Sequence, residues 1–571
     1  MNLPTFLNEV DAHTASMTHE ELTAFIHEIA RTLPAEQREA FLSKLTEISE
    51  IIQEDETDSD EPKTLLEQLD KICSGEFRLD SQLNEEYDDW YDSEETEFDF
   101  EDGDGLLDII NTACTKLHQM IDKADYEEAY LLGQKLITLK VQTDGDYTDY
   151  LDNGMNLCDL EIYDLIKTPV ETVLLDVLCA CYFTLSPEEK PSMMYQIGKS
   201  FRRVKWTLEE LIQSAPTELP EMESFLTNWI EFLGSVSEQS AEELLLEAIT
   251  MQNQPVQALE TARKFSAIHP VLYEKALAMQ TDDEIRLKIG LEALEKLDTW
   301  YLIRSNIALQ TAEIAIRLGM PKEAEYCRLE AFRSETTPLN YLRALLNSSD
   351  FEACQNELYE ILKHLLGTHT KEEFRLDRPK SQAKNFVTDE TNRLIKFLNG
   401  KFLKAYGNLQ SQINGYHSDI LEQGTALTAL FLYPSDTLQE GAKAMCSYLV
   451  KSLPFDAKKY NQGVEDFSEK DSVTLLWQCL KKCREHLPLT NPENALDNLQ
   501  KLCVTATEYV MQNDMRKQYE DCAVLAAVIG EIQELNSHFN KNDFLLECKA
   551  KYPRRIAYHR ELRKYGMKDG K

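Results

Sequence analysis

The sequence predicts an almost entirely helical protein, in which an N-terminal helical hairpin is followed by an α-solenoid of degenerate helix pairs. Gly and Pro number only 20 and 18 among 571 residues, so tight turns are few. Long runs of Leu, Ala, Glu, Lys and Gln favour helix. A short turn signature also recurs four times between amphipathic segments. A chain of this length does not form one compact core, and an extended repeat array accommodates it.

Residues 1–52 are predicted to form the helical hairpin. Thr18 and Glu21 have the spacing of a capping box, which marks the start of a first helix. Pro34 suits the first turn of a second helix, where its missing N–H costs nothing. The stretch "TLLEQLDKIC" (64–73) has the composition of a third helix, which would extend the hairpin to residue 73.

Residues 53–104 are predicted to form an acidic, aromatic linker, because they hold 22 acidic side chains and 3 basic ones. Self-repulsion of this strength opposes compact folding and favours an extended chain. The stretch 84–105 is unusual for a plain spacer because it carries five aromatic rings: Tyr87, Trp90, Tyr91, Phe98 and Phe100. Three interpretations stay open, namely a plain linker, an arm whose rings pack into the solenoid, and a docking arm whose rings bind a partner. A calcium loop is not supported, because neither Gly103 nor Gly105 gives an EF-hand register with acidic ligands.

Four short stretches share one pattern: a small residue or Asn, any residue, then Tyr, Phe or Pro, any two residues, and Ala. They are "ADYEEA" (124–129), "NQPVQA" (253–258), "GMPKEA" (319–324) and "GKFLKA" (400–405). The first position tolerates a turn, the third begins the next helix, and Ala lets paired helices approach closely. Residues 105–430 are therefore predicted to form the helical repeats, and residues 431–571 a C-terminal helical region.

The residues after two of these turns resemble the second helix of a tetratricopeptide repeat. The matching positions are Ala258, Ala262, Phe265 and Pro270 after the second turn, and Ala324, Arg328 and Ala331 after the third. The resemblance implies tetratricopeptide-like helix pairs that stack into a curved solenoid, since one pair cannot bury its apolar face alone. The alternative is a set of unrelated helical hairpins that use the same turn chemistry.

The order of segments also resembles a more specific family. An acidic, aromatic stretch is followed by "KADYEEAYLLGQKL", later by "IALQTAEIAIRLGMPKEAEYC", and finally by "AKYPRRIAYHRELRKYG". This order is similar to the helical-repeat region of uncharacterised bacterial proteins that often carry a SWIM-type zinc finger. The finger itself is absent, because Cys179-x-Cys181 has no Cys-x-His after it. The resemblance therefore implies no zinc site and no defined activity.

The last residues reverse the charge of the chain. Residues 549–571 contain nine Lys or Arg and two acidic residues. The candidate basic contact surface for an anion, such as RNA or an acidic partner, consists of Arg554, Arg555, Arg560, Arg563 and Lys564. The alternatives are a solvated last helix whose cations suit its C-terminal end, and a tail that lies against the acidic segment.

The sequence carries no recognisable catalytic or metal-binding motif, so no catalytic residue, metal ligand or cofactor is predicted. The "GKS" at 198–200 lacks the earlier Gly of a phosphate loop, and its surroundings are typical of helix. Cys479, Cys483 and His486 share one helical face, but apolar neighbours favour core packing over metal binding. The sequence contains no nucleophile elbow and no His-Glu-x-x-His motif.

Charge and hydropathy limit the kinds of partner and the cellular compartment that we expect. The net charge of −42 makes nucleic-acid binding unlikely, and no apolar run is long enough for a membrane helix. The 13 scattered Cys suit free thiols, and the start of the chain does not have the features of a secretion signal. We therefore expect a cytoplasmic protein without a membrane partner.

These observations predict a non-catalytic scaffold or adaptor that binds a protein or peptide through its helical-repeat surface. The alternative is an accessory or inhibitory subunit whose acidic segment mimics nucleic acid for a basic partner. An enzyme with an unrecognised site is the third possibility.

Overall fold

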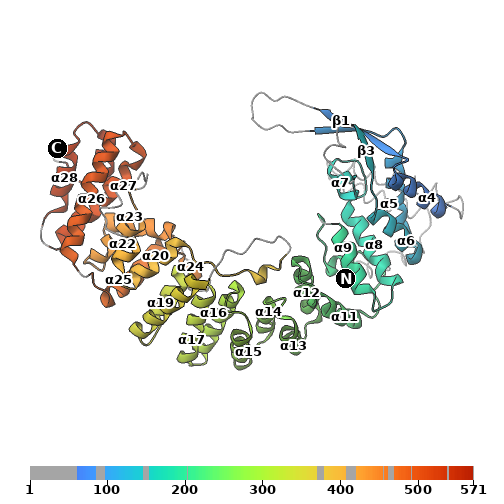
Figure 1. The fold of residues 1–571 in the computed structure, drawn as a ribbon, viewed down its shortest axis with the longest axis horizontal. Helices are drawn as coiled ribbons and strands as arrows, with labels where there is room; N and C mark the ends of the chain where they lie inside the picture. The colour runs from blue at the N-terminus through green and yellow to red at the C-terminus, as the bar shows by residue number, and fades with distance from the viewer. Residues whose placement is uncertain are drawn as a thin grey trace, which may run out of the picture. The chain divides into compact units, whose positions relative to one another are not determined.

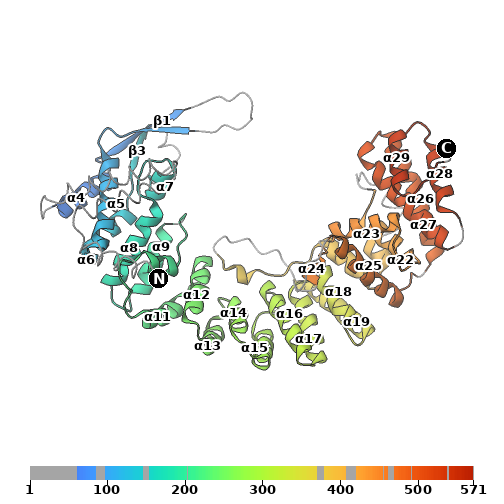
Figure 2. The same ribbon diagram turned by 180° about the vertical axis from the view of Figure 1, so that it is seen from behind.

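A computed structural model shows the fold (Figures 1 and 2). The residues that it describes are 61–84, 97–145, 154–201, 203–368, 378–406, 420–453, 455–460, 469–489, 491–536 and 539–569. Helices dominate and the described strands form one small sheet, which confirms the predicted all-α class. No helix within the described ranges has both the length and the apolar character needed to cross a bilayer. The predicted hairpin of residues 1–52 lies outside these ranges.

The chain divides into two compact units, Met1–Asn253 and Gln254–Lys571. The described part of the first unit begins with a helix and two strands, and continues mainly through short helices. In chain order these are α4 (Glu61–Ser74), β1 (Arg78–Asn84), β2 (Glu97–Glu101), α5 (Leu106–Asp122), α6 (Tyr126–Ile137), β3 (Gln142–Gly145), α7 (Leu157–Ile162), α8 (Val170–Thr184), α9 (Lys190–Ser200), α10 (Leu208–Ser214), α11 (Met222–Gly234) and α12 (Gln239–Gln252).

The sheet has the strand order β2-β1-β3. Strand β2 pairs antiparallel with β1, and β3 pairs with β1 in parallel. Because side chains of a strand alternate between two faces, Leu79 and Ser81 are buried while Asp80 is exposed. Asp80 lies opposite Glu101 of β2 and Asp144 of β3, so three carboxylates form a row across the exposed face.

The prediction of an extended linker over residues 53–104 is wrong for its described part. Helix α4 contains the stretch 64–73, where the sequence offers a third helix, and it buries Leu69 and Ile72. The strands β1 and β2 stand where an extended linker was predicted. The acidic residues do not prevent folding here because they face solvent or have specific partners. The carboxylate of Asp102, for example, accepts the backbone N–H groups of Leu106 and Leu107 at 2.9 and 2.8 Å, at the start of α5.

All four predicted turns have the expected backbone geometry. The first residue of each has a positive φ: Ala124 at 61°, Asn253 at 48°, Gly319 at 71° and Gly400 at 71°. The third residue begins the next helix in every case: Tyr126, Pro255, Pro321 and Phe402. The final Ala is at most 5% exposed: Ala129, Ala258, Ala324 and Ala405. The predicted turn chemistry is thus confirmed, whereas the tetratricopeptide likeness stays a resemblance.

The second unit begins with a row of helices in which each packs on the next, from α13 to α19 (Figure 1). Its elements are α13 (Pro255–Phe265), α14 (Val271–Met279), α15 (Asp283–Lys296), α16 (Leu302–Arg317), α17 (Pro321–Ser334), α18 (Pro338–Leu346), α19 (Phe351–Thr368), η3 (Lys380–Gln382), α20 (Asp389–Leu398), α21 (Phe402–Tyr406), α22 (Gln423–Leu432), α23 (Glu440–Ser452), α24 (Ala457–Tyr460), α25 (Glu469–His486), α26 (Pro492–Gln512), η5 (Arg516–Gln518), α27 (Tyr519–Leu535), α28 (Lys541–Lys551) and α29 (Ile556–Lys564).

Helix α27 is the centre of the C-terminal region. Every residue from Cys522 to Ile532 is buried, and the helix packs against α23, α26, α28 and α29. A helix that is apolar on all sides belongs in a core. The C-terminal region is therefore a bundle around one helix.

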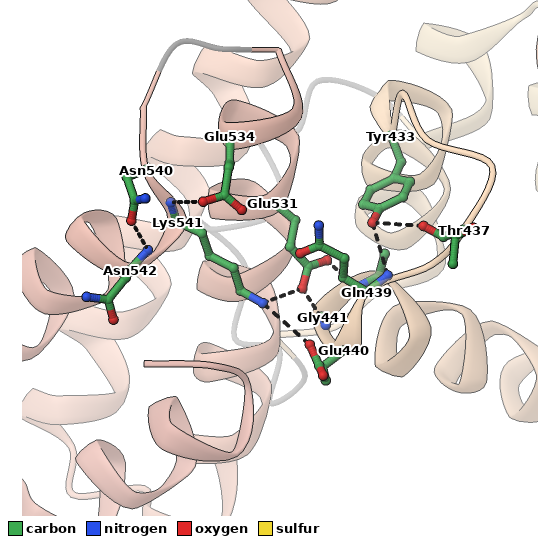
Figure 3. A network of polar contacts seen from close by, with 11 residues as sticks. Tyr433, Thr437, Gln439, Glu440, Gly441, Glu531, Glu534, Asn540, Lys541 and Asn542 are labelled. Carbon is green, nitrogen blue, oxygen red and sulfur yellow. Dashed lines mark hydrogen bonds and ion pairs between the residues drawn. The ribbon is translucent and has the colours of Figure 1, made fainter. Parts of the chain in front are cut away.

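A buried carboxylate joins three helices of this bundle (Figure 3). Glu531 of α27 is 0% exposed, and it accepts the backbone N–H groups of Gly441 and Ala442, both at 2.8 Å. These N–H groups belong to the first turn of α23, where the helix dipole favours a negative charge. The Lys541 ammonium of α28 donates to the same carboxylate at 2.8 Å. The charge on Glu531 is thus compensated on two sides.

Candidate functional site

An extended segment of the second unit lies against the loops that join its helix pairs. Residues 378–388, which we call the strap, form a short 3-10 turn and then run extended to the start of α20. The backbone N–H of Leu302 donates to the Ala383 carbonyl at 2.8 Å, and the N–H of Asn385 donates to the Trp300 carbonyl at 2.8 Å. Tyr301 and Lys384 form an antiparallel bridge between these bonds. The strap is therefore held by main-chain pairing, as an added strand would be.

Two carboxamide side chains fix the strap on either side of this bridge. Gln382 donates to the Ile268 carbonyl at 2.5 Å and accepts from the Arg378 guanidinium at 2.8 Å. Asn385 accepts the Thr336 N–H at 3.1 Å and donates to the Thr336 hydroxyl at 2.9 Å. Both carboxamides are less than 10% exposed. The two side-chain amides of the strap thus hydrogen-bond to backbone groups of the loops that join the helices.

The strap connects three successive helix pairs. Its partners lie in or beside the loop 266–270 between α13 and α14, the loop 297–301 between α15 and α16, and the loop 335–337 between α17 and α18. We call these three loops the loop row. The loop row and the strap form the surface on which the functional argument rests.

A pocket of about 530 Å³ lies between the first two loops of the loop row. Residues of α13, α14, α15 and the loops 266–270 and 297–301 line it, among them Arg263, Ser266, Tyr273, Glu292, Lys296 and Tyr301. Volumes of this size are typical of ligand sites. Tyr301 belongs both to the pocket and to the bridge with the strap, so the pocket adjoins the strap.

One wall of the pocket is a preorganised polar network. The Arg263 guanidinium donates to both oxygens of Glu292, at 2.8 and 2.7 Å, and to Glu260 at 2.8 Å. The Tyr273 hydroxyl donates to Glu292 at 3.0 Å. The Arg263 hydrogen bonds lower the pKa of Glu292, and burial together with Glu292 raises the pKa of Tyr273. Glu292 is therefore ionised and Tyr273 protonated at neutral pH.

The other wall of the pocket carries polar groups that can still form hydrogen bonds. Among the described residues, the Lys296 ammonium and the side-chain hydroxyls of Ser266 and Tyr301 have no hydrogen-bond partner. Asp298 uses one carboxylate oxygen to accept the Trp300 N–H at 3.1 Å. These groups are available to a ligand in the pocket.

Buried charges hold the helix ends near the loop row. The Arg304 guanidinium donates to the Leu294 carbonyl at 2.6 Å and forms an ion pair with Glu330. Arg343 donates to the carbonyls of Tyr460 and Lys459 at the end of α24, at 3.1 and 2.6 Å. Burial lowers the pKa of Arg343 to about 10. Such buried charges, hydrogen-bonded to groups on neighbouring helices, fix the helices relative to one another.

The predicted aromatic arm is only partly within the described residues. Tyr87, Trp90 and Tyr91 lie outside them. Phe98 and Phe100 are on β2, with ring centroids 6.4 Å apart, and the Phe100 ring packs edge-on against Tyr163 at 5.1 Å. Phe100 therefore contributes to the packing of the first unit, and partner binding by the arm stays a prediction.

Three residues of the predicted basic surface are paired within the second unit. Arg555 forms an ion pair with Asp514, Arg563 donates to Asp569 at 3.1 Å, and Lys564 lies 2.6 Å from Glu561. The remaining two candidates, Arg554 and Arg560, are exposed. Anion binding at this surface stays a prediction.

The cysteine motifs pack in the core. Cys479 and Cys483 are buried in α25, and the His486 ring stacks on Phe351 with centroids 4.0 Å apart. Cys179 and Cys181 are buried in α8. The described ranges contain no group of three or more His, Cys, Asp or Glu placed to hold a metal ion.

Sequence reasoning missed the strap and the pocket. The strap sequence, "RPKSQAKNFVT", has no helical periodicity, and its Pro379 and its two amides could have marked a non-helical insertion. Its partners lie far away in the chain, 114 residues in the case of Gln382 and Ile268. The pocket has no local signal, because single Arg, Lys and Glu residues occur on many of the described helices.

In comparisons with known proteins, no family model matches the chain, and no curated protein matches it.

Proposed function

We propose that the protein is a non-catalytic scaffold or adaptor that binds a protein or peptide partner through its helical-repeat surface. The observation that carries the proposal is the strap, an extended segment held on the loop row by main-chain hydrogen bonds. A surface that accommodates one extended segment in this way suits recognition of another. The pocket beside the strap adds polar groups that remain available for hydrogen bonds.

Photo-cross-linking from the two ends of one helix tests this proposal. Benzoylphenylalanine is placed at Lys296, where α15 meets the loop row, or at Ile285, near the other end of α15. The full chain carrying either substitution is irradiated in its native cells, and cross-linked proteins are identified by mass spectrometry. We expect a partner that cross-links from position 296 and not from position 285. A partner that cross-links equally from both ends, or only from position 285, contradicts the proposal.

A second candidate function rests on the row of carboxylates across the sheet, Glu101, Asp80 and Asp144, of which Asp144 is paired with the Arg78 guanidinium at 2.9 Å. This face suits a basic partner that otherwise binds nucleic acid, and the sequence between β1 and β2, residues 85–96, is also rich in Asp and Glu. Replacement of residues 85–96 by a Gly-Ser linker retains both strands of the β1–β2 pair. Under this candidate function, the replacement abolishes a binding that also weakens steeply with salt. Under the scaffold function, the cross-link from position 296 is retained.

A further inference from the structure

The pocket between the first two loops of the loop row has walls whose formal charges cancel. Arg263 and Lys296 contribute two positive charges, and Glu292 and Asp298 contribute two negative ones. An anionic ligand would meet two carboxylates, and a cationic ligand would meet an ammonium and a guanidinium. The Arg263 guanidinium and the Glu292 carboxylate are already bonded to each other, so neither is available to pair with a charged ligand. The charge pattern thus favours a neutral ligand.

The available hydrogen-bonding groups specify the polarity of that ligand. The Lys296 ammonium and the hydroxyls of Ser266 and Tyr301 can donate, and the second oxygen of Asp298 can accept. A ligand that matches them presents an acceptor and a donor side by side. A primary carboxamide has this arrangement, with one carbonyl oxygen and one NH₂ group.

The strap provides independent support for an amide. It is anchored on this same loop row by two carboxamides, those of Gln382 and Asn385. Gln382 reaches the Ile268 carbonyl, one residue from the pocket-lining Ala267. The contacts of Gln382 and Asn385 therefore show that the loop row can bind carboxamides.

We propose that the pocket binds the carboxamide side chain, Gln or Asn, of a partner segment that runs extended beside the strap. Lys296 and Ser266 donate to the two lone pairs of its carbonyl oxygen, and the Asp298 carboxylate and the Tyr301 hydroxyl accept from its NH₂ group. This inference rests on the proposed function, because it specifies which peptides the helical-repeat surface selects.

Selection from a displayed library of random twelve-residue peptides tests the inference. The full chain is immobilised as the wild type, as Lys296→Met, as Ser266→Ala, or as the control Lys288→Met. Lys288 is exposed on the same helix, two turns before Lys296, and does not line the pocket. We expect Gln or Asn to be enriched at one peptide position by the wild type and the control. With Lys296→Met and Ser266→Ala, peptides are still captured but the enrichment at that position is lost.

A selected peptide is then compared with its Gln→Leu and Gln→Glu forms by fluorescence anisotropy. Both changes are expected to weaken binding by about tenfold or more, because they leave the pocket's polar groups unmatched. Enrichment of charged residues at that position, or Gln enrichment that survives Lys296→Met, overturns the inference and leaves the proposed function standing. Failure of every form of the chain to capture any peptide overturns both.

Discussion

At the scale of single residues, the four helix turns differ in how well their first residue suits its backbone. Asn253, Gly319 and Gly400 are residue types that tolerate a positive φ, whereas Ala124 places a Cβ in the same left-handed region at φ 61°. The signature allows any small residue at this position, but the backbone there favours Gly. Ala124 therefore carries a local strain.

Substitution of this residue is expected to stabilise the first unit. Ala124→Gly should raise the free energy of unfolding by about 0.5–1 kcal/mol, because relief of the strain exceeds the added flexibility of the unfolded chain. The reverse change, Gly319→Ala, should cost about 1 kcal/mol in the second unit. A Cβ at Gly319 would meet no atom within 4 Å, so strain alone is measured there. Urea unfolding followed by circular dichroism measures both, and a destabilising Ala124→Gly would contradict the argument.

The buried Glu531 should be the residue on which the C-terminal bundle depends most. Glu531→Gln is expected to destabilise the second unit by about 3–5 kcal/mol, because it leaves the buried Lys541 ammonium with only the exposed Glu440 carboxylate, 3.8 Å away, as a counter-charge. The exposed neighbour Glu534, which accepts the Lys541 backbone N–H at 3.3 Å, is the matched control. Glu534→Gln should change stability by no more than about 0.5 kcal/mol in denaturant unfolding. If the two variants are equally stable, Glu531 does not have this role.

His118 is expected to make the stability of the first unit depend on pH. Its Nδ1 lies 3.0 Å from the buried Asp176 carboxylate, and this hydrogen bond raises the pKa of His118 above 6.5. A raised pKa means that the stabilisation is fully present below pH 6.5 and is lost as the pH rises through the folded-state pKa. The wild type should therefore exceed the His118→Gln variant in free energy of unfolding by more at pH 6 than at pH 9. A pH-independent difference in unfolding free energy would contradict this.

At the scale of elements, the sequence predicts the features that depend on adjacent residues and misses those that depend on residues far apart in the chain. Each helix turn is specified by six adjacent residues, so the sequence alone predicts its position. Strand β1, in contrast, depends on β3, which pairs Asp80 with Asp144 across an intervening helical hairpin. Composition therefore predicted an extended linker where the strands β1 and β2 occur, whereas the local pattern over 64–73 did predict the helix α4. The strap was missed for the same reason, since its partners belong to three separate helix pairs.

The strap's attachment should depend on Asn385 and not on its neighbour. Asn385→Ala is expected to cost about 1–3 kcal/mol, because it leaves the buried Thr336 N–H without its acceptor. Hydrogen exchange of peptides covering residues 378–388 should accelerate in this variant. Phe386→Ser is the control, since the Phe386 side chain is 57% exposed. Equal acceleration in both variants would mean that the carboxamide does not anchor the strap.

At the scale of the whole molecule, charge opposes compactness. The chain carries 101 acidic and 59 basic residues, a net charge of −42. Self-repulsion of this size destabilises the folded state, and salt screens it. The thermal unfolding midpoint should therefore rise when NaCl is increased from about 20 to about 300 mM. A fall in the midpoint would mean that attractive ion pairs, such as that of Arg317 with Asp283, outweigh the net repulsion.

The strap also changes how the helical row should unfold. In a simple stack, each repeat interacts only with its neighbours, and the ends can fray one pair at a time. The strap adds a connection between non-neighbours, because it bonds to Ile268 of the first helix pair and to Thr336 of the third. Loss of either end pair therefore also breaks contacts held by the pair at the other end. The helices α13 to α18 are accordingly expected to open as one cooperative unit, in the manner of a closed ring and not of a linear chain.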